Sequence, residues 1–177
     1  MSFGIERFMF YSGRKLYGFL VTKISIPGAL AKVASIIAEK GLDIVCSSFS
    51  ATERGKIGTM LFFIDFTGID LKPEALAREI EALDFVKEVK IIKPRAEGFI
   101  ADTLSFPITL GPQRAIIMSE AGLRGLRVDI RERIGTGAEV ILYFTGFEVG
   151  REWAKYYGNM AESIGIRDLS TFEYMIV

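Results

Sequence analysis

The side chains that most enzymes use for catalysis are scarce in this sequence of 177 residues. It contains no histidine, and Cys46 is its single cysteine. The commonest general base, the Ser–His and Cys–His nucleophile pairs and the imidazole ligands of most transition-metal sites are therefore absent. No close pair of carboxylates points to acid–base chemistry, and only a carboxylate site for a hard cation stays open. We predict no catalytic residue, no metal site, no cofactor and a protein that is not an enzyme.

One loop has the chemistry of a binding site. Pro27 and Gly28 follow an apolar stretch and precede a segment with apolar residues at helical spacing. Gly28 has no Cβ, so a ligand can approach the backbone closely, and the N–H groups in the first turn of the helix can bind a carboxylate or other anion. The alternative is that these two residues merely turn a strand into a helix. The predicted ligand-binding residues are Ser25, Ile26, Gly28, Ala29, Leu30, Asp43 and Ile44.

A second candidate site lies in the last third of the sequence. Glu148, Arg151 and Glu152 are spaced three and four residues apart, which places them on one face of a helix. A solvated, salt-bridged face is the simplest interpretation. The alternative is a site for a sugar or organic acid, in which Glu148 and Arg151 act on the ligand and Trp153 and Tyr157 line a pocket.

The elements that would position the first loop alternate between strands and helices. Short apolar runs rich in β-branched and aromatic residues predict strands, whereas apolar residues three and four apart predict amphipathic helices. Gly41 caps the first helix, and Asp70 and Pro73 mark the start of the second. The predicted order is strand 16–24, helix 29–40, strand 43–51, strand 59–66, helix 73–84 and strand 86–92.

This βαββαβ order is that of the ferredoxin-like sandwich, an antiparallel sheet with both helices on one face. The strand predicted over residues 59–66 is apolar on both sides, because Phe62 and Ile64 alternate with Leu61 and Phe63. The face without helices therefore also needs a cover. We predict that a second copy of the domain or the C-terminal half supplies it.

A polar segment over residues 95–98 marks a predicted domain boundary. The predicted parts are an N-terminal extension over residues 1–14, the ferredoxin-like domain over 15–94 and an α+β domain over 95–177. The elements expected in this last domain are strands over 104–110 and 115–119, helices over 123–134 and 137–157, and a β-rich tail over 169–177 that closes a second sheet.

The first loop and its helix carry a family resemblance. Residues 25–33 read Ser-Ile-Pro-Gly-Ala-Leu-Ala-Lys-Val, and residues 36–44 read Ile-Ile-Ala-Glu-Lys-Gly-Leu-Asp-Ile. This pattern resembles the opening of an ACT domain, and the resemblance covers residues 15–93. Ser25 stands where the family often has aspartate, and Asp43 stands where asparagine is frequent. The resemblance implies a regulatory domain that binds an amino acid where this loop of one copy meets another copy.

The C-terminal half has a second resemblance. Residues 106–112 read Phe-Pro-Ile-Thr-Leu-Gly-Pro, and residues 141–152 read Ile-Leu-Tyr-Phe-Thr-Gly-Phe-Glu-Val-Gly-Arg-Glu. With the helix between them, these segments are similar to the first part of 4-vinyl-reductase-like ligand-sensing domains. The resemblance implies two helices and a sheet around an apolar pocket, although the cysteine-bearing end common in that family is missing.

The composition argues against several classes of partner. There are 22 basic and 22 acidic residues, so the formal net charge is zero, and no dense basic cluster suggests nucleic-acid binding. No apolar stretch approaches the length of a membrane span, and the N-terminus lacks the pattern of a secretory signal, so we predict a cytoplasmic protein without a membrane partner. A single asparagine and a single glutamine suit a thermophile.

These observations together predict a metabolic regulator. We expect it to bind a small polar metabolite, such as an amino acid, at the strand–helix loop and to signal allosterically through a homo-oligomer that is at least a homodimer. The output would pass to a separate protein. Two alternatives stay open. The first is that the C-terminal domain binds a small molecule, such as a sugar or organic acid, or has enzymatic activity. The second is that the protein is an oligomerisation scaffold without a ligand.

Overall fold

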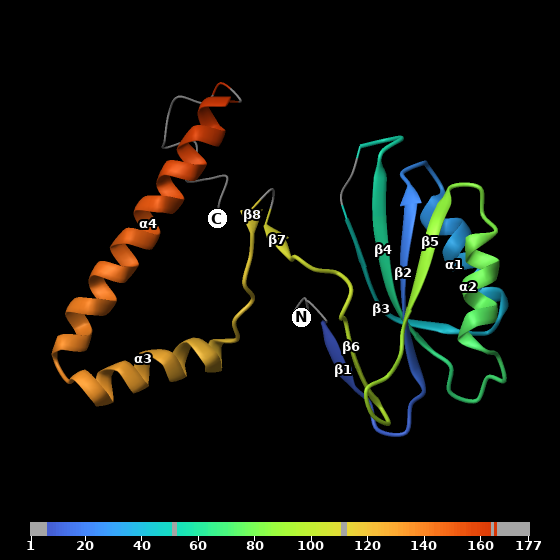
Figure 1. Ribbon diagram of the computed structural model, residues 1–177, viewed down its shortest axis with the longest axis horizontal. Helices are drawn as coiled ribbons and strands as arrows, with labels where there is room; N and C mark the ends of the chain where they lie inside the picture. The colour runs from blue at the N-terminus through green and yellow to red at the C-terminus, as the bar shows by residue number, and fades with distance from the viewer. Residues whose placement is uncertain (1–6, 51–52, 111–112, 164, 166–177) are drawn as a thin grey trace. The chain divides into compact units, whose positions relative to one another are not determined.

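The chain divides into two compact units, Met1–Ala115 and Ile116–Val177 (Figure 1). The computed structural model describes residues 7–50, 53–110, 113–163 and 165. The first unit contains the main sheet, and the described part of the second unit contains two helices. This division falls later in the chain than the boundary predicted near residue 95.

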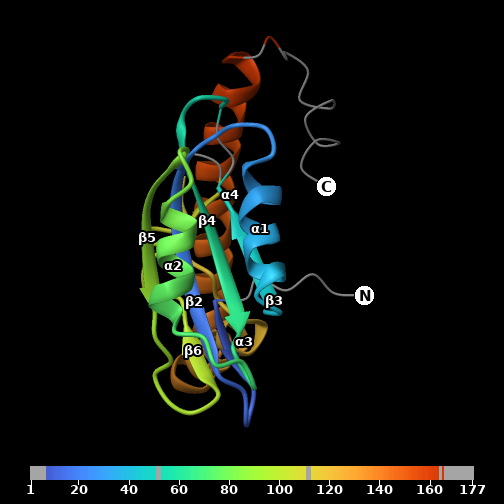
Figure 2. The ribbon, with the colours of Figure 1, turned by 90° about the vertical axis from the view of Figure 1, so that its right-hand side faces the viewer.

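The first unit is built on a four-stranded antiparallel sheet with the strand order β3-β4-β2-β5. Its elements along the chain are β2 (Leu16–Ile24), α1 (Ala29–Glu39), β3 (Asp43–Phe49), β4 (Ile57–Asp65), α2 (Pro73–Glu81) and β5 (Val86–Ile92). Both helices lie on one face of the sheet, in front of it in Figure 2. The predicted α+β class and the ferredoxin-like βαββαβ sandwich are therefore confirmed for this unit.

The main core lies between the sheet and the two helices. Strand β4 places Phe62 and Ile64 on this face, where both are fully buried, and α1 and α2 add Ile37 and Ile80, which are also fully buried. Burying one such side chain contributes about 1.5–3 kcal/mol to the stability of the fold. The apolar side chains on one face of β4 and the apolar faces of α1 and α2 thus pack together in one core.

The opposite face of the sheet, called the helix-free face below, is partly covered by the flanks of the same unit. Strand β1 (Phe8–Phe10) pairs antiparallel with β6 (Phe99–Ala101), and in Figure 1 this pair lies across the sheet from the helices. Its side chains Met9 and Ile100 are buried against Leu61 and Phe63 of β4. Part of the predicted cover thus comes from β1, in the predicted N-terminal extension, and part from β6, in the predicted C-terminal domain.

The second unit is helical in its described part. Helix α3 (Glu120–Ile134) begins after Ser119, whose hydroxyl accepts a hydrogen bond from the Gly122 N–H, and ends at Gly135, as predicted. Helix α4 (Gly137–Ser163) extends beyond its predicted end at residue 157. None of the helices that the structure describes has both the length and the apolarity that a membrane crossing needs.

The strands predicted around residues 104–119 are mostly wrong. In the described part of that stretch, Thr109–Leu110 (β7) forms a strand that pairs with Gln113–Arg114 (β8) in a short hairpin. Pro107 lacks a backbone N–H for a ladder, and residues 115–119 are not a strand, with Ile116 91% exposed. The predicted β-rich tail lies outside the described residues, so its closing of a second sheet stays a prediction.

Candidate functional site

The predicted binding loop, residues 25–30, forms a corner between β2 and α1 and is called the corner below. Gly28 occupies the N-cap position of α1 with φ 79°, a left-handed conformation that strains any residue with a Cβ. A Cβ built at Gly28 would meet nothing within 4 Å. No described side chain caps this end of α1, so the backbone around Gly28 is open to an approaching ligand.

The corner is held in place from the neighbouring turn. The Ser25 N–H donates to the Lys56 carbonyl at 2.8 Å, and the Gly55 N–H donates to the Ser25 carbonyl at 2.8 Å. Ile26 and Leu30 are 37% and 43% exposed, so apolar side chains flank the open backbone. Ala29 is buried and anchors the first turn of α1 in the core.

Asp43 and Ile44 do not lie beside the corner within one chain. The sheet register pairs Asp43 with Asp65, and Asp65 with Leu16, at the beginning of β2. The corner follows Ile24, at the other end of β2. The structure therefore brings Ser25, Ile26, Gly28, Ala29 and Leu30 together and separates them from the two β3 residues by the length of the sheet.

The second candidate set lies on α4. Glu148 and Arg151 form an ion pair, and both side chains are more than half exposed, which is the solvated face that the spacing favours. Trp153 and Tyr157 contact each other edge to face with their ring centres 5.7 Å apart. A hollow of about 560 Å³ between α3 and α4 is lined by different residues, namely Arg127, Val128, Arg131, Ala138, Glu139, Leu142 and Tyr143.

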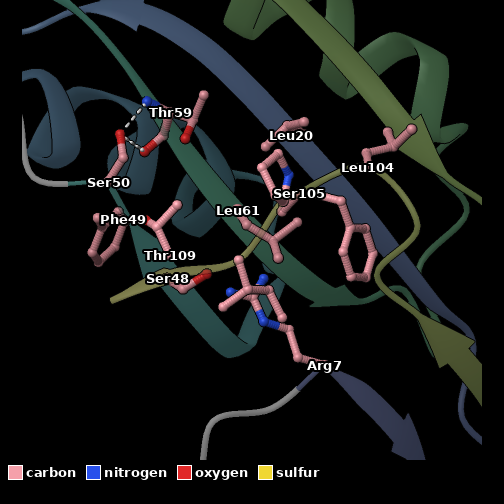
Figure 3. Close-up of a pocket in the computed structure, with 13 residues that line it drawn as sticks. Arg7, Leu20, Ser48, Phe49, Ser50, Thr59, Leu61, Leu104, Ser105 and Thr109 are labelled. Carbon is pink, nitrogen blue, oxygen red and sulfur yellow. Dashed lines mark hydrogen bonds between the residues drawn. The ribbon is translucent and has the colours of Figure 1, made fainter. Parts of the chain in front are cut away.

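A further hollow of about 570 Å³ lies on the helix-free face of the first unit, and sequence reasoning missed it (Figure 3). Leu20 of β2, Ser48 of β3 and Leu61 of β4 line it from the sheet, because alternate residues of neighbouring strands point to the same face. The segment 104–109 crosses over it, and Arg7 completes its wall.

An ion pair between Arg7 and Asp102 holds the wall of this hollow in place. Nη1 of Arg7 lies 2.6 Å from Oδ2 of Asp102, whose residue is only 5% exposed. Oδ1 of Asp102 accepts hydrogen bonds from the Leu104 and Ser105 N–H groups, each at 3.0 Å. Burial raises the pKa of Asp102, but these backbone hydrogen bonds, the Arg7 guanidinium and the Ser105 hydroxyl together bring the pKa below its ordinary value. Asp102 is therefore ionised at neutral pH.

Metal-ligating side chains do not cluster in the part of the chain that the structure describes. Among those residues, no three histidine, cysteine, aspartate or glutamate side chains gather closely enough to hold a metal ion. The groups that the described residues offer to a ligand are backbone N–H groups at the corner, and hydroxyl and guanidinium groups at the helix-free face.

Comparison with known proteins gives structural neighbours only. No protein-family model matches the sequence, and no curated protein sequence matches it. The ACT domain from GTP pyrophosphokinase of Chlorobium tepidum matches with 16% identity and a TM-score of 0.38, over 45% of this chain and 99% of that one. A homoserine dehydrogenase from Thiobacillus denitrificans matches with 22% identity and a TM-score of 0.36, over 46% of this chain and 18% of that one. A formyltetrahydrofolate deformylase from Pseudomonas syringae matches with 14% identity and a TM-score of 0.42, over 49% of this chain and 30% of that one.

Proposed function

We propose that this chain is a regulatory module that binds an amino acid or a similar small polar metabolite at the corner between β2 and α1. The observation that carries the proposal is the open, left-handed backbone at Gly28, directly before the first turn of α1. The resemblance of residues 25–44 to the opening of an ACT domain supports it. The role proposed is regulatory rather than catalytic.

A second copy would complete the site. Strand β3 is an edge strand of the sheet, so it can pair with β3 of another copy about a two-fold axis. If the two strands run antiparallel, Asp43 of one copy lies near the partner's Phe49. Phe49 pairs with Met60 and thus belongs to the half of the sheet that carries the corner. Asp43 and Ile44 would then approach the partner's corner rather than their own.

Such a composite site suits a zwitterion. The N–H groups at the start of α1 favour a carboxylate, because the helix dipole places partial positive charge there. The Asp43 carboxylate supplied by the other copy would favour an ammonium group. Ile26 and Leu30 offer apolar contacts to the ligand's side chain. Occupancy would therefore strengthen the pairing of the two copies, which is the signal that a separate target protein could read.

The test is a thermal-shift screen of the purified 177-residue chain against free amino acids, sugars and nucleotides. A specific ligand at a hundredfold excess over its Kd should stabilise the fold by about 2.7 kcal/mol. Gly28→Asp should abolish that stabilisation, because a carboxylate then occupies the corner. Gly68→Asp is the matched control, since Gly68 has a similar left-handed φ of 75° and equally open surroundings.

A mixing experiment tests the two-copy site. The Gly28→Asp chain and the Asp43→Ala chain should each fail to bind the ligand alone. A mixed dimer of the two chains contains one corner in which Gly28 of one copy meets Asp43 of the other copy. Random mixing in equal amounts should restore about a quarter of the binding sites. If the mixture binds no ligand while the wild-type chain does, Asp43 does not act across the dimer.

A second candidate function is binding of a sugar or organic acid by the second unit. The hollow between α3 and α4 favours it, because Arg127 and Arg131 line it beside Glu139, and Arg131 Nη2 lies 3.1 Å from Glu139 Oε1. A ligand whose stabilising effect survives Gly28→Asp but is lost in Arg127→Ala would support this reading. Absence of any ligand would favour the oligomerisation scaffold.

A further inference from the structure

We propose that the hollow on the helix-free face is a second ligand site, which takes a small uncharged molecule with an apolar body and a carbonyl oxygen. This inference goes beyond the proposed function, because the hollow lies on the opposite face of the sheet from the helices. Its volume of about 570 Å³ falls within the range of small-molecule sites, which is about 300–1,000 Å³.

The wall of the hollow includes one hydrogen-bond donor that has no partner among the described residues. Nε of Arg7 is buried and has no hydrogen-bond partner among the described residues. The Ser105 hydroxyl is also buried, but it already interacts with the Asp102 carboxylate and helps to lower the pKa of Asp102. An unsatisfied buried polar group is costly, so a ligand oxygen that reaches Nε of Arg7 after a small shift of that side chain would be favoured.

The charges around the hollow favour an uncharged ligand. Asp102 is ionised and lies 2.6 Å from Arg7, so the guanidinium charge is already balanced. A carboxylate entering beside Arg7 would add an uncompensated negative charge close to Asp102. A carbonyl or amide oxygen can accept from the same N–H and O–H groups without that cost.

The remaining wall is suited to an apolar body. Leu20 and Leu61 come from the sheet, and Leu104, Phe106 and Ile108 come from the segment that crosses over it. The Ser50 hydroxyl is already engaged within the protein, because Ser50 Oγ accepts from the Thr59 N–H at 2.7 Å, as Figure 3 shows. The apolar side chains form about half of the lining and offer contacts to the apolar body, and Arg7 orients the ligand.

The experiment uses phenylacetamide and phenylacetate as paired probes with the full 15N-labelled chain. Both probes have the same ring, and only the amide is uncharged. We expect phenylacetamide to shift the backbone resonances of Ser48, Thr59 and Ser105 and to leave those of α4 unchanged. Phenylacetate should bind about tenfold more weakly.

Two variants locate the contact. Arg7→Lys keeps the ion pair with Asp102 but removes Nε, and the loss of one hydrogen bond should weaken phenylacetamide binding about three- to tenfold. Ser48→Phe, at an exposed strand position on the rim, should block entry even if Arg7→Lys does not fold. Gly28→Asp should leave phenylacetamide binding unchanged, so failure of the corner site and failure of this site can be told apart.

Three results would overturn the proposal. The first is that neither probe shifts resonances at the hollow. The second is that phenylacetate binds more tightly than phenylacetamide, which would refute the argument from charge. The third is that Ser48→Phe binds phenylacetamide as well as the wild-type chain does, which would place the probe elsewhere.

Discussion

Replacing Asp102 by asparagine tests how the wall of the helix-free face is held. The side chain of Asp102 is fully buried, and its carboxylate accepts from Arg7 at 2.6 Å and from two backbone N–H groups at 3.0 Å. The asparagine side chain could still accept from the backbone with its carbonyl oxygen, so the main loss is the charge-assisted bond to Arg7. A hydrogen bond to a charged group contributes about 1.5–3 kcal/mol, and Arg7 is 26% exposed, so water recovers part of the loss. We expect Asp102→Asn to lower the free energy of unfolding by about 2 kcal/mol.

The assay is urea unfolding followed by circular dichroism and by the backbone resonances of the first unit. With a slope of about 2 kcal/mol per molar urea, the midpoint should fall by about 1 M. Glu88→Gln is the control, since Glu88 pairs with Lys90 at 3.2 Å and both side chains are half exposed. An exposed pair contributes less than about 1 kcal/mol, so this variant should behave almost like the wild-type chain.

The difference in stability between the wild-type chain and Asp102→Asn should also depend on pH in a definite direction. The pKa of Asp102 in the folded chain lies below its ordinary value of 3.8, so the folded state favours the ionised form. That contribution is complete above the ordinary value and is lost as the pH falls through the folded pKa. The gap between the wild-type chain and Asp102→Asn should be constant near neutral pH and shrink below about 3.8. Equal stabilities at neutral pH, or a gap that widens in acid, would refute the reasoning.

Two further substitutions test the packing of the helix-free face, each by urea unfolding. A Cβ at Gly18 would stand 2.9 Å from Cβ of Ile92, so Gly18→Ala should destabilise the fold by about 1–3 kcal/mol. The control is Gly125→Ala, at an open helical position, which should be neutral or stabilise the fold by up to about 1 kcal/mol. Ile100→Ala should cost about 2–5 kcal/mol because Ile100 is fully buried, and the exposed Phe8→Ala on the paired strand should cost far less. Equal effects of Ile100→Ala and Phe8→Ala would mean that β1 and β6 do not cover the sheet as described.

The sandwich could be predicted because its signals are local. Each strand of the sheet is seven or nine residues long, enough for alternation to be visible, and α1 and α2 show apolar residues at helical spacing. Strands β1 and β6 have three residues each and show no periodicity. Their pairing joins residues that are distant in the sequence, which a local pattern cannot reveal.

The corner could be predicted in part, for a similar reason. The positive φ of Gly28 follows from the need to turn from a strand into a helix, and that need is visible in the sequence. The distance between Asp43 and Gly28 depends on the sheet register, which the family pattern does not show. The hollow on the helix-free face depends on Arg7 and Asp102, which are 95 residues apart in the sequence. Neither residue type is unusual enough to draw attention by itself.

The pairing of β1 with β6 also fixes an order of events during synthesis. The ribosome releases the chain from its N-terminus, so Phe8 is exposed long before Ala101, its partner in the register, has been made. The elements from Leu16 to Ile92 can close their sheet in that interval, because they need nothing that lies later in the chain. Until β6 arrives, Leu61 and Phe63 lack the part of their cover that Ile100 provides. We therefore expect the first unit to be more prone to aggregation before β6 has left the ribosome than after it.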